Sequence, residues 1–142
     1  MQISFLKLDP DLPTPSRAHR TDGGVDLYSR VDTTLPPGEW FPVPTGISLA
    51  IPAGYAGLVI PRSGLAANHG IGLGNGPGLV DAGYRGEIKV ILINHGSTEF
   101  KVLRGDRIGQ LMITRLPDYE LVEVDSLESS DRAEGGFGST GR

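Results

Sequence analysis

The chain has 142 residues, a formal net charge of −4 and no cysteine. The length suits a single domain with one core, and the absence of cysteine excludes disulfides and cysteine-ligated zinc. The negative charge argues against a nucleic-acid partner, because binding duplex nucleic acid requires a broad basic surface.

The N-terminal stretch MQISFLKLDPDLP contains no apolar run of signal-peptide length. No segment approaches the roughly 20 apolar residues that a membrane span needs. These two features predict a cytoplasmic protein without a membrane partner.

Short apolar runs bounded by proline, glycine or aspartate recur along the chain and predict an all-β protein. The 21 glycines and 11 prolines supply the turns, which favours a sandwich, a jelly roll or a small barrel. The expected strands, in chain order, are residues 3–8, 24–29, 40–42, 46–51, 57–60, 88–93, 108–114 and 120–124. The stretch SGLAANHG, residues 63–70, provides the one helical turn that we expect.

We expect the β-domain to cover residues 1–125. The last stretch, residues 126–142, is glycine-rich and has no hydrophobic period. One interpretation is a disordered tail. The alternative is a flexible arm that wraps a charged ligand, because a cation, a ring and two hydroxyls stand among its glycines, at Arg132, Phe137, Ser139 and Thr140.

The glycine-rich stretch GIGLGNGPG, residues 70–78, does not satisfy G-x-G-x-x-G in any register, and the tail lacks the Walker spacing. We therefore predict a β-hairpin at residues 71–81, whose glycines let a ligand approach the backbone. The histidines show no metal-binding spacing. Any metal is expected to be a hard ion such as Mg²⁺, held mostly by oxygens of the substrate.

Several polar residues interrupt the apolar runs, and each allows two interpretations. In PRSGLA, Arg62 and Ser63 suit an anion site, or Ser63 is the N-cap of a surface turn. In GGVDLYS, Asp26 lies on the solvent side of a strand, or it is buried and paired. In RGDRIGQLMI, Gln110 faces outward or donates a hydrogen bond to a ligand.

The stretch GLVDAGYRGEIKVILIN, residues 78–94, ends as a buried strand and begins with polar side chains. From its own pattern, Asp81 is a turn residue that introduces the strand, or a carboxylate that does chemistry. We expect Arg85 and Glu87 to form structural ion pairs.

These polar stretches occur in a specific order. Arg62 precedes Asn75 by 13 residues and Asp81 by 19, and Tyr84 follows Asp81 by three. Taken together, the set resembles the five motifs of the trimeric dUTP pyrophosphatases (dUTPases), from about residue 21 to residue 141. The five stretches are GGVDLYS, PRSGLA, GNGPGLVDAGYRGEIKV, RGDRIGQLM and RAEGGFGSTG.

The resemblance implies a jelly-roll-type β-barrel of the β-clip kind, three chains with three shared active sites, and hydrolysis of dUTP to dUMP and pyrophosphate. Asp81 would deprotonate the water that attacks the α-phosphorus. Tyr84 would lie under the deoxyribose, and Phe137 would stack over uracil. The remaining uracil and sugar contacts would come from Asn75, Gly78, Leu79, Val80 and, less directly, Lys89.

The resemblance also implies the phosphate site. Its residues would be Arg62, Ser63, Gly64 and Gln110 of a neighbouring chain, with Arg132, Gly138, Ser139 and Thr140 of the arm. Mg²⁺ would be chelated by the triphosphate, with no direct protein ligand and with Asp26 acting through water.

The sequence departs from the family pattern at Gly23, Leu79, Val80 and Ala133, all small or apolar replacements. A dCTP deaminase, or a bifunctional deaminase and dUTPase, shares the fold and is the alternative function. It typically needs a second serine after Arg62–Ser63, where this chain has Gly64. A non-catalytic β-domain is a further alternative, which the presence of both Asp81 and the tail motif disfavours.

Overall fold

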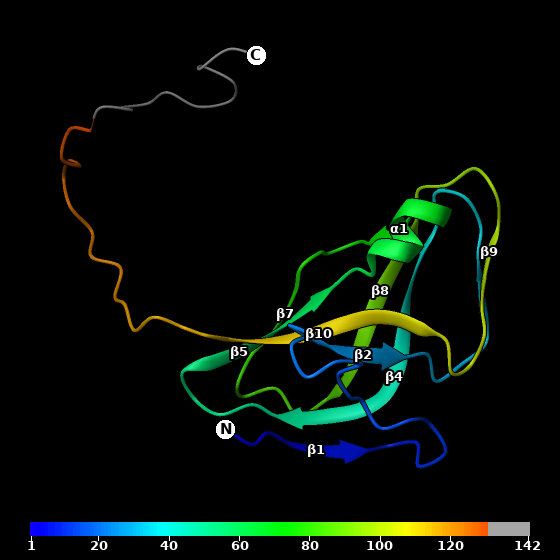
Figure 1. Cartoon of the computed structure of the whole chain (residues 1–142). Coiled ribbons are helices and arrows are strands. Elements are labelled where there is room, and N and C mark those ends of the chain that lie inside the picture. The colour runs from blue at the N-terminus through cyan, green and yellow to red at the C-terminus, as the bar shows by residue number, and fades with distance from the viewer. Residues whose placement is uncertain (131–142) are drawn as a thin grey trace.

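The computed structural model describes residues 1–130, which form ten strands and one short helix (Figure 1). The all-β prediction is confirmed, and the helix begins where it was expected. The elements are β1 (Ser4–Lys7), β2 (Val25–Tyr28), β3 (Thr33–Leu35), β4 (Trp40–Ala50), β5 (Tyr55–Ile60), α1 (Ser63–His69), β6 (Ile71–Leu73), β7 (Gly78–Val80), β8 (Glu87–Asn94), β9 (Phe100–Val102) and β10 (Arg107–Arg115).

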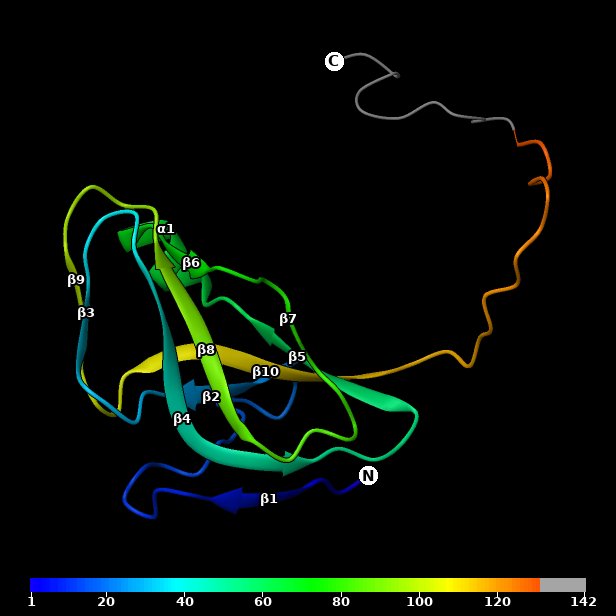
Figure 2. The same cartoon turned by 180° about the vertical axis from the view of Figure 1, so that it is seen from behind.

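The strands form three antiparallel sheets that pack around one core and stay separate, without closing into a continuous barrel (Figures 1 and 2). One sheet has the order β1-β4-β8-β6, the second β2-β10-β5-β7, and β3 pairs with β9. Strands that follow one another in the chain thus often lie in different sheets. Neighbouring strands within one sheet therefore come from distant parts of the sequence, and their side chains lie next to each other.

Buried and more exposed side chains alternate along β8, so only one face of this strand belongs to the core. Ile88, Val90 and Leu92 are buried, whereas Lys89 between them is exposed. Successive side chains of a strand point to opposite faces, so one face of β8 joins the core and the other stays open. The open face forms one wall of the cavity described below.

Strand β4 is one long strand, although the sequence predicted two, at 40–42 and 46–51. The register between β4 and β8 shifts between Pro44 and Ser48. Gly46 lies there with φ of 72°, a conformation that glycine adopts without steric cost. Strand β4 continues past Pro42 and Pro44, and Figure 2 shows that it bends strongly.

The prediction of a β-hairpin at residues 71–81 is wrong. Strand β6 pairs with β8, and β7 pairs with β5, so the two short strands belong to different sheets. The segment between them crosses from one sheet to the other. Short apolar stretches separated by glycines do not reveal which partner strand each will find, because pairing depends on the whole fold.

The strand predicted at residues 120–124 is also absent. After β10 the chain has no strand or helix through residue 130, and Leu121, Val122 and Val124 are exposed. Figure 1 shows this segment leading away from the sheets. A strand requires a neighbour for its backbone hydrogen bonds, and the part of this chain that is described offers none to the segment.

No helix among residues 1–130 is long and apolar enough to cross a membrane.

A network of charges fixes the loops at one end of the fold. Arg104 Nη2 donates to both carboxylate oxygens of Asp9, at 2.7 and 2.8 Å. Arg30 lies 3.7 Å from Asp9 and 3.3 Å from Glu87. Partial burial raises the pKa of Asp9, but the hydrogen bonds from Arg104 and from the backbone of Asp11, with the two guanidinium charges, outweigh it and hold the pKa below its usual 3.8.

This network predicts a pH-dependent contribution to stability. Because the pKa of Asp9 is lower in the folded chain, its contribution is present above the unfolded pKa and is lost as the pH falls through the folded value. We expect Asp9→Asn to lower Tm at pH 7, with a difference from the unmodified protein that shrinks below pH 3.8. Thermal unfolding from neutral to acid pH checks this. Asp118→Asn, at an exposed position, is the control, and a pH-independent difference would contradict the expectation.

Candidate active site

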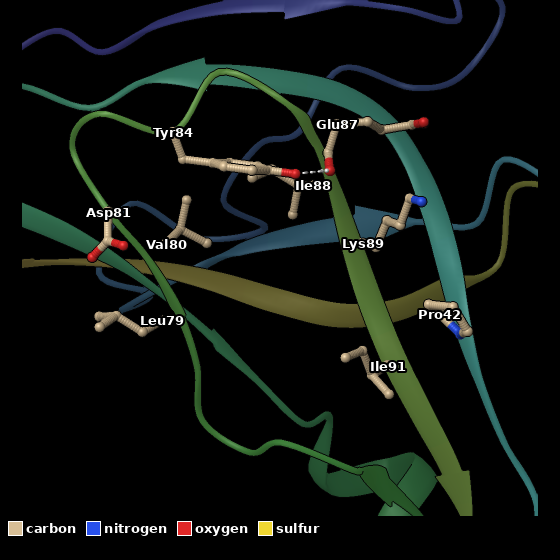
Figure 3. Close-up of a pocket in the computed structure, with 9 residues that line it drawn as sticks. All are labelled: Pro42, Leu79, Val80, Asp81, Tyr84, Glu87, Ile88, Lys89 and Ile91. Carbon is tan, nitrogen blue, oxygen red and sulfur yellow. Dashed lines mark hydrogen bonds between the residues drawn. The ribbon is translucent and has the colours of Figure 1, made fainter.

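A cavity opens between the end of β7, the loop that follows it and the outer face of β8 (Figure 3). Five residues predicted from the sequence for base, sugar and catalysis line it together. They are Leu79, Val80, Asp81, Tyr84 and Lys89, and the other lining residues are Pro42, Glu87, Ile88 and Ile91. The cavity thus combines apolar side chains with two carboxylates, a phenol and an amine.

Asp81 is the first residue after β7, whose backbone is fixed by pairing with β5. The N–H of Tyr84 donates to the carbonyl of Asp81 at 3.0 Å, which closes a turn directly after the strand. The Asp81 side chain is exposed. The interpretation of Asp81 as a turn residue is therefore confirmed. Its carboxylate is open to water, and its role in chemistry stays a prediction.

The loop 82–87 is held from both ends. Tyr84 Oη donates to the carbonyl of Glu87 at 3.1 Å, and Arg85 Nη1 donates to the carbonyls of Ala82 and Tyr84 at 2.6 and 2.8 Å. The carboxylate of Glu87 binds Arg30 and accepts the N–H of Gly46 at 2.8 Å. The predicted ion pair is confirmed for Glu87. It is wrong for Arg85, which within the described chain bonds backbone carbonyls instead.

Asn75 and Gly78 precede the cavity and lie against each other. A Cβ at Gly78 would come within 3.2 Å of Asn75 Nδ2 and 3.5 Å of Val59 Cβ. Gly78 therefore lets the Asn75 amide fold over the start of β7. Asn75 is exposed and does not line the cavity itself.

A second cluster surrounds Asp26, which is only 8% exposed. Asp26 lies directly opposite Gln110 in the pairing of β2 with β10, and Gln110 Nε2 donates to its Oδ1 at 3.3 Å. Arg62 Nε lies 3.5 Å from Oδ1, and Arg107 Nη1 lies 3.3 Å from Oδ2. The buried and paired interpretation of Asp26 is correct, as a buried carboxylate requires.

The cluster continues into α1. Arg62 is the N-cap residue, and no side chain caps this helix end. The alternative that Ser63 is an N-cap is therefore wrong, since Ser63 is the first helical residue. A Cβ at Gly64 would meet nothing within 4 Å, so the surface beside Arg62 is open to a ligand.

Arg107 is a member of this cluster that the sequence analysis did not single out. Its carbonyl accepts a hydrogen bond from Arg62 Nη1 at 3.1 Å, and both residues border a second cavity with Phe100. The position of Arg107 three residues before Gln110 in the same strand was the available signal, but the two are not on one face of a regular strand. A register shift between Arg107 and Gly109 brings both to Asp26.

The two clusters do not meet within one chain. Val80, next to Asp81, pairs with Gly57 on β5, and β5 then runs away from Asp81 toward Arg62. Arg62 follows Gly57 by five residues, which corresponds to roughly 15 Å of extended chain. The predicted residues thus form one cluster around Asp81 and another around Asp26. Arg132, Phe137, Gly138, Ser139 and Thr140 lie outside the described residues.

Comparison with known proteins identifies the class of protein. A family model described as dUTPase matches residues 11–141. A protein from Mycolicibacterium gilvum named deoxyuridine 5'-triphosphate nucleotidohydrolase is 56% identical over an alignment of 145 residues. The alignment covers 98% of this chain and 94% of that protein. One of the same name from Gloeobacter violaceus is 50% identical over 143 residues, 99% of this chain and 97% of that one.

Solved structures agree with the sequence comparison. The dUTPase of Staphylococcus bacteriophage 80alpha with dUpNHpp matches with a TM-score of 0.90 and 28% identity, covering 99% of both chains. A G164S mutant of the same phage enzyme, also with dUpNHpp, matches equally well. These matches confirm the β-clip fold and place the molecule among the all-β nucleotide hydrolases. The chain belongs to the dUTPase family.

Proposed function

We propose that this protein hydrolyses dUTP to dUMP and pyrophosphate by attack of water on the α-phosphorus. The observation that carries the proposal is the cavity in which Asp81 and Tyr84 stand together on one turn, fixed by the pairing of β7 with β5. The relatives' names and the dUpNHpp bound to the phage enzyme support the same substrate. The reaction keeps uracil out of DNA, supplies dUMP for dTTP synthesis and takes place in the cytoplasm.

Asp81 is the general base. Its carboxylate accepts a proton from a water molecule held at the mouth of the cavity, and the resulting nucleophile attacks the α-phosphorus while the bond to the leaving pyrophosphate breaks. A positioned base of this kind typically contributes about 10²–10⁴-fold to the rate. The strand and turn that hold the carboxylate supply the rigid mount that such a role needs.

Sugar and base are recognised by the walls of the same cavity. The Tyr84 ring lies under the deoxyribose and leaves no room for a 2′-hydroxyl. The Asn75 amide, with the backbone of Gly78, Leu79 and Val80, reads the edge of uracil. The Leu79 side chain is exposed, so its departure from the family pattern changes the rim of the cavity and leaves the backbone hydrogen-bonding groups in place. Lys89 contributes a positive charge to the opposite wall.

The Asp26 cluster binds the phosphates of a substrate held by the Asp81 cluster of a neighbouring chain in a homotrimer. Arg62 suits this role because its planar guanidinium forms paired hydrogen bonds with phosphate oxygens. Ser63, Gly64 and Gln110 add a hydroxyl, an open backbone and an amide beside it. The separation of the two clusters along β5 supports a site shared between two chains, since one chain alone presents only half of it.

The described residues fit a Mg²⁺ ion that arrives with the triphosphate. Residues 1–130 contain no group of three or more histidine, aspartate or glutamate side chains that would hold a metal. Asp26 Oδ1 accepts a hydrogen bond from Gln110 and Oδ2 accepts one from Arg107, while Arg62 forms an ion pair with Oδ1. These contacts support a role in which Asp26 reaches such an ion through water. When bound, Mg²⁺ spreads the charge of the triphosphate and aligns it for in-line attack.

Residues 126–142 complete the site as an arm, with residues 1–125 as the catalytic domain. Phe137 stacks over uracil, and Arg132, Gly138, Ser139 and Thr140 bind the outer phosphates. An arm of this kind excludes water from the reacting groups when it closes. Binding energy from the remote phosphates then contributes to orienting the α-phosphorus.

The test is a nucleotide panel with purified protein and Mg²⁺, in which pyrophosphate and ammonia are both measured. We expect pyrophosphate from dUTP at a kcat/KM at least about 10²-fold above that for dTTP, dCTP and UTP. Ammonia release from dCTP would instead establish the deaminase or bifunctional alternative. Equal rates for all nucleotides would contradict the specificity assigned to the cavity.

A further inference from the structure

The aromatic ring of Tyr84 rests on the backbone of Gly86. A Cβ built at Gly86 would collide with Tyr84 Oη and would lie 2.6 Å from Cζ and 3.0 Å from Cε2 of the same ring. Real side chains do not approach so closely, so the ring occupies the space that any other residue at position 86 would fill. Tyr84 is nevertheless 47% exposed, which leaves the rest of its surface to the cavity.

The ring is held at its far end as well. Its hydroxyl donates to the carbonyl of Glu87 at 3.1 Å, as Figure 3 shows. Glu87 begins β8 and is itself fixed by Arg30 and by the N–H of Gly46. Tyr84 is thus fixed at one end by its own turn and at the other by an anchored strand, with Gly86 between.

Gly86 is not needed for the conformation of the backbone. The glycines with positive φ are Gly38, Gly46, Gly54, Gly70 and Gly105, and Gly86 is not among them. Alanine is therefore compatible with the backbone at this position. The atoms it would meet belong to the end of the Tyr84 side chain, which rotates away at much lower cost than a backbone shift.

We propose that Gly86 is a positioning residue, which keeps the Tyr84 ring in the place from which the ring excludes a 2′-hydroxyl. Gly86 thereby sets the selectivity between deoxyribose and ribose. This inference rests on the proposed function. A Cβ at position 86 displaces the ring, removes the bond to Glu87 and reshapes the sugar side of the cavity, while Asp81 keeps its place after β7.

The experiment compares kcat/KM for dUTP and UTP in Gly86→Ala. We expect the preference for dUTP to fall by about 10-fold or more, with Tm within a few degrees of the unmodified protein. Gly83→Ala is the matched control, because it lies in the same loop, also lacks a positive φ, and a Cβ there meets nothing within 4 Å. An unchanged preference in Gly86→Ala, or an equal change in Gly83→Ala, would overturn the inference.

A double-variant cycle separates positioning of the ring from a general effect on the loop. We expect Tyr84→Ala to lower the dUTP preference, and Gly86→Ala to add nothing further in that background. A full additional loss there would show that Gly86 acts independently of the ring and would overturn the inference.

A spectroscopic arm keeps the inference testable without turnover. The protein has four tyrosines. When it is labelled with 3-fluorotyrosine, the fluorine NMR signal of Tyr84 is the one that is missing from the spectrum of Tyr84→Phe. We expect Gly86→Ala to shift this signal and Gly83→Ala to leave it in place. An unmoved signal in Gly86→Ala contradicts the inference, whereas an unmodified protein that does not hydrolyse dUTP contradicts the proposed function.

Discussion

Asp81→Asn is expected to lower kcat for dUTP by about 10²–10⁴-fold while nucleotide binding is retained. Asparagine keeps the shape of the side chain and loses the charge that accepts the proton from water. The carboxylate is exposed and belongs to no ion pair among residues 1–130. Its removal therefore leaves the turn intact, because that turn depends on the backbone bond from Tyr84 to Asp81.

The measurement is single-turnover release of pyrophosphate, with dUpNHpp affinity measured separately by calorimetry. Asp125→Asn is the matched control, since it removes one exposed carboxylate outside both clusters. Hydrolysis by Asp81→Asn at the rate of the control would exclude Asp81 as the base. Loss of analogue binding with a normal single-turnover rate would assign it a binding role instead.

Arg62→Ala is expected to lower kcat/KM for dUTP by about 10²–10³-fold, the usual effect of removing one preorganised electrostatic contact to a developing charge. The variant also loses the 3.5 Å ion pair with Asp26. Asp26 keeps Arg107 and Gln110 as partners, so the fold should persist.

Arg62→Lys separates charge from geometry. Lysine retains the positive charge but lacks the planar fork, so we expect an activity between those of the unmodified protein and Arg62→Ala. Steady-state kinetics over a range of dUTP concentrations, together with Tm, checks both variants. An Arg62→Ala protein with unchanged kcat/KM would remove Arg62 from the phosphate site.

The strands with strong apolar patterns were predictable from the sequence, whereas the three-residue strands β3 and β9 were not. The alternating run of β8 and the β-rich run of β10 were recognised near their observed bounds. Strands β3 and β9 have three residues each and pair only with one another. So short a run carries too little periodicity to be distinguished from a loop.

Pairing was harder to predict than strand content. The segment at residues 71–81 looks like a hairpin, yet its two strands join different sheets. Residues 120–124 have the composition of a strand and find no partner in the described chain. Both errors arise because a strand forms only by pairing with another strand, and the local sequence does not determine which strand that is.

Most members of the two clusters were predictable from the sequence motifs, but the contacts around Asp26 were not. Leu79, Val80, Asp81, Tyr84 and Lys89 were expected together and line one cavity. Asp26, Arg62 and Gln110 come from three separate stretches, and their contact depends on the adjacency of β2, β10 and β5. Arg107 was missed because only a shift of register aims it at Asp26.

The most direct test of the account mixes the two inactive variants. Asp81→Asn and Arg62→Ala chains are unfolded together, refolded as a 1:1 mixture and assayed for hydrolysis of dUTP. If each site takes its base from one chain and its phosphate-binding arginine from the next, random trimers regain roughly a quarter of the unmodified activity. A mixture as inactive as its separate components would contradict a site shared between chains.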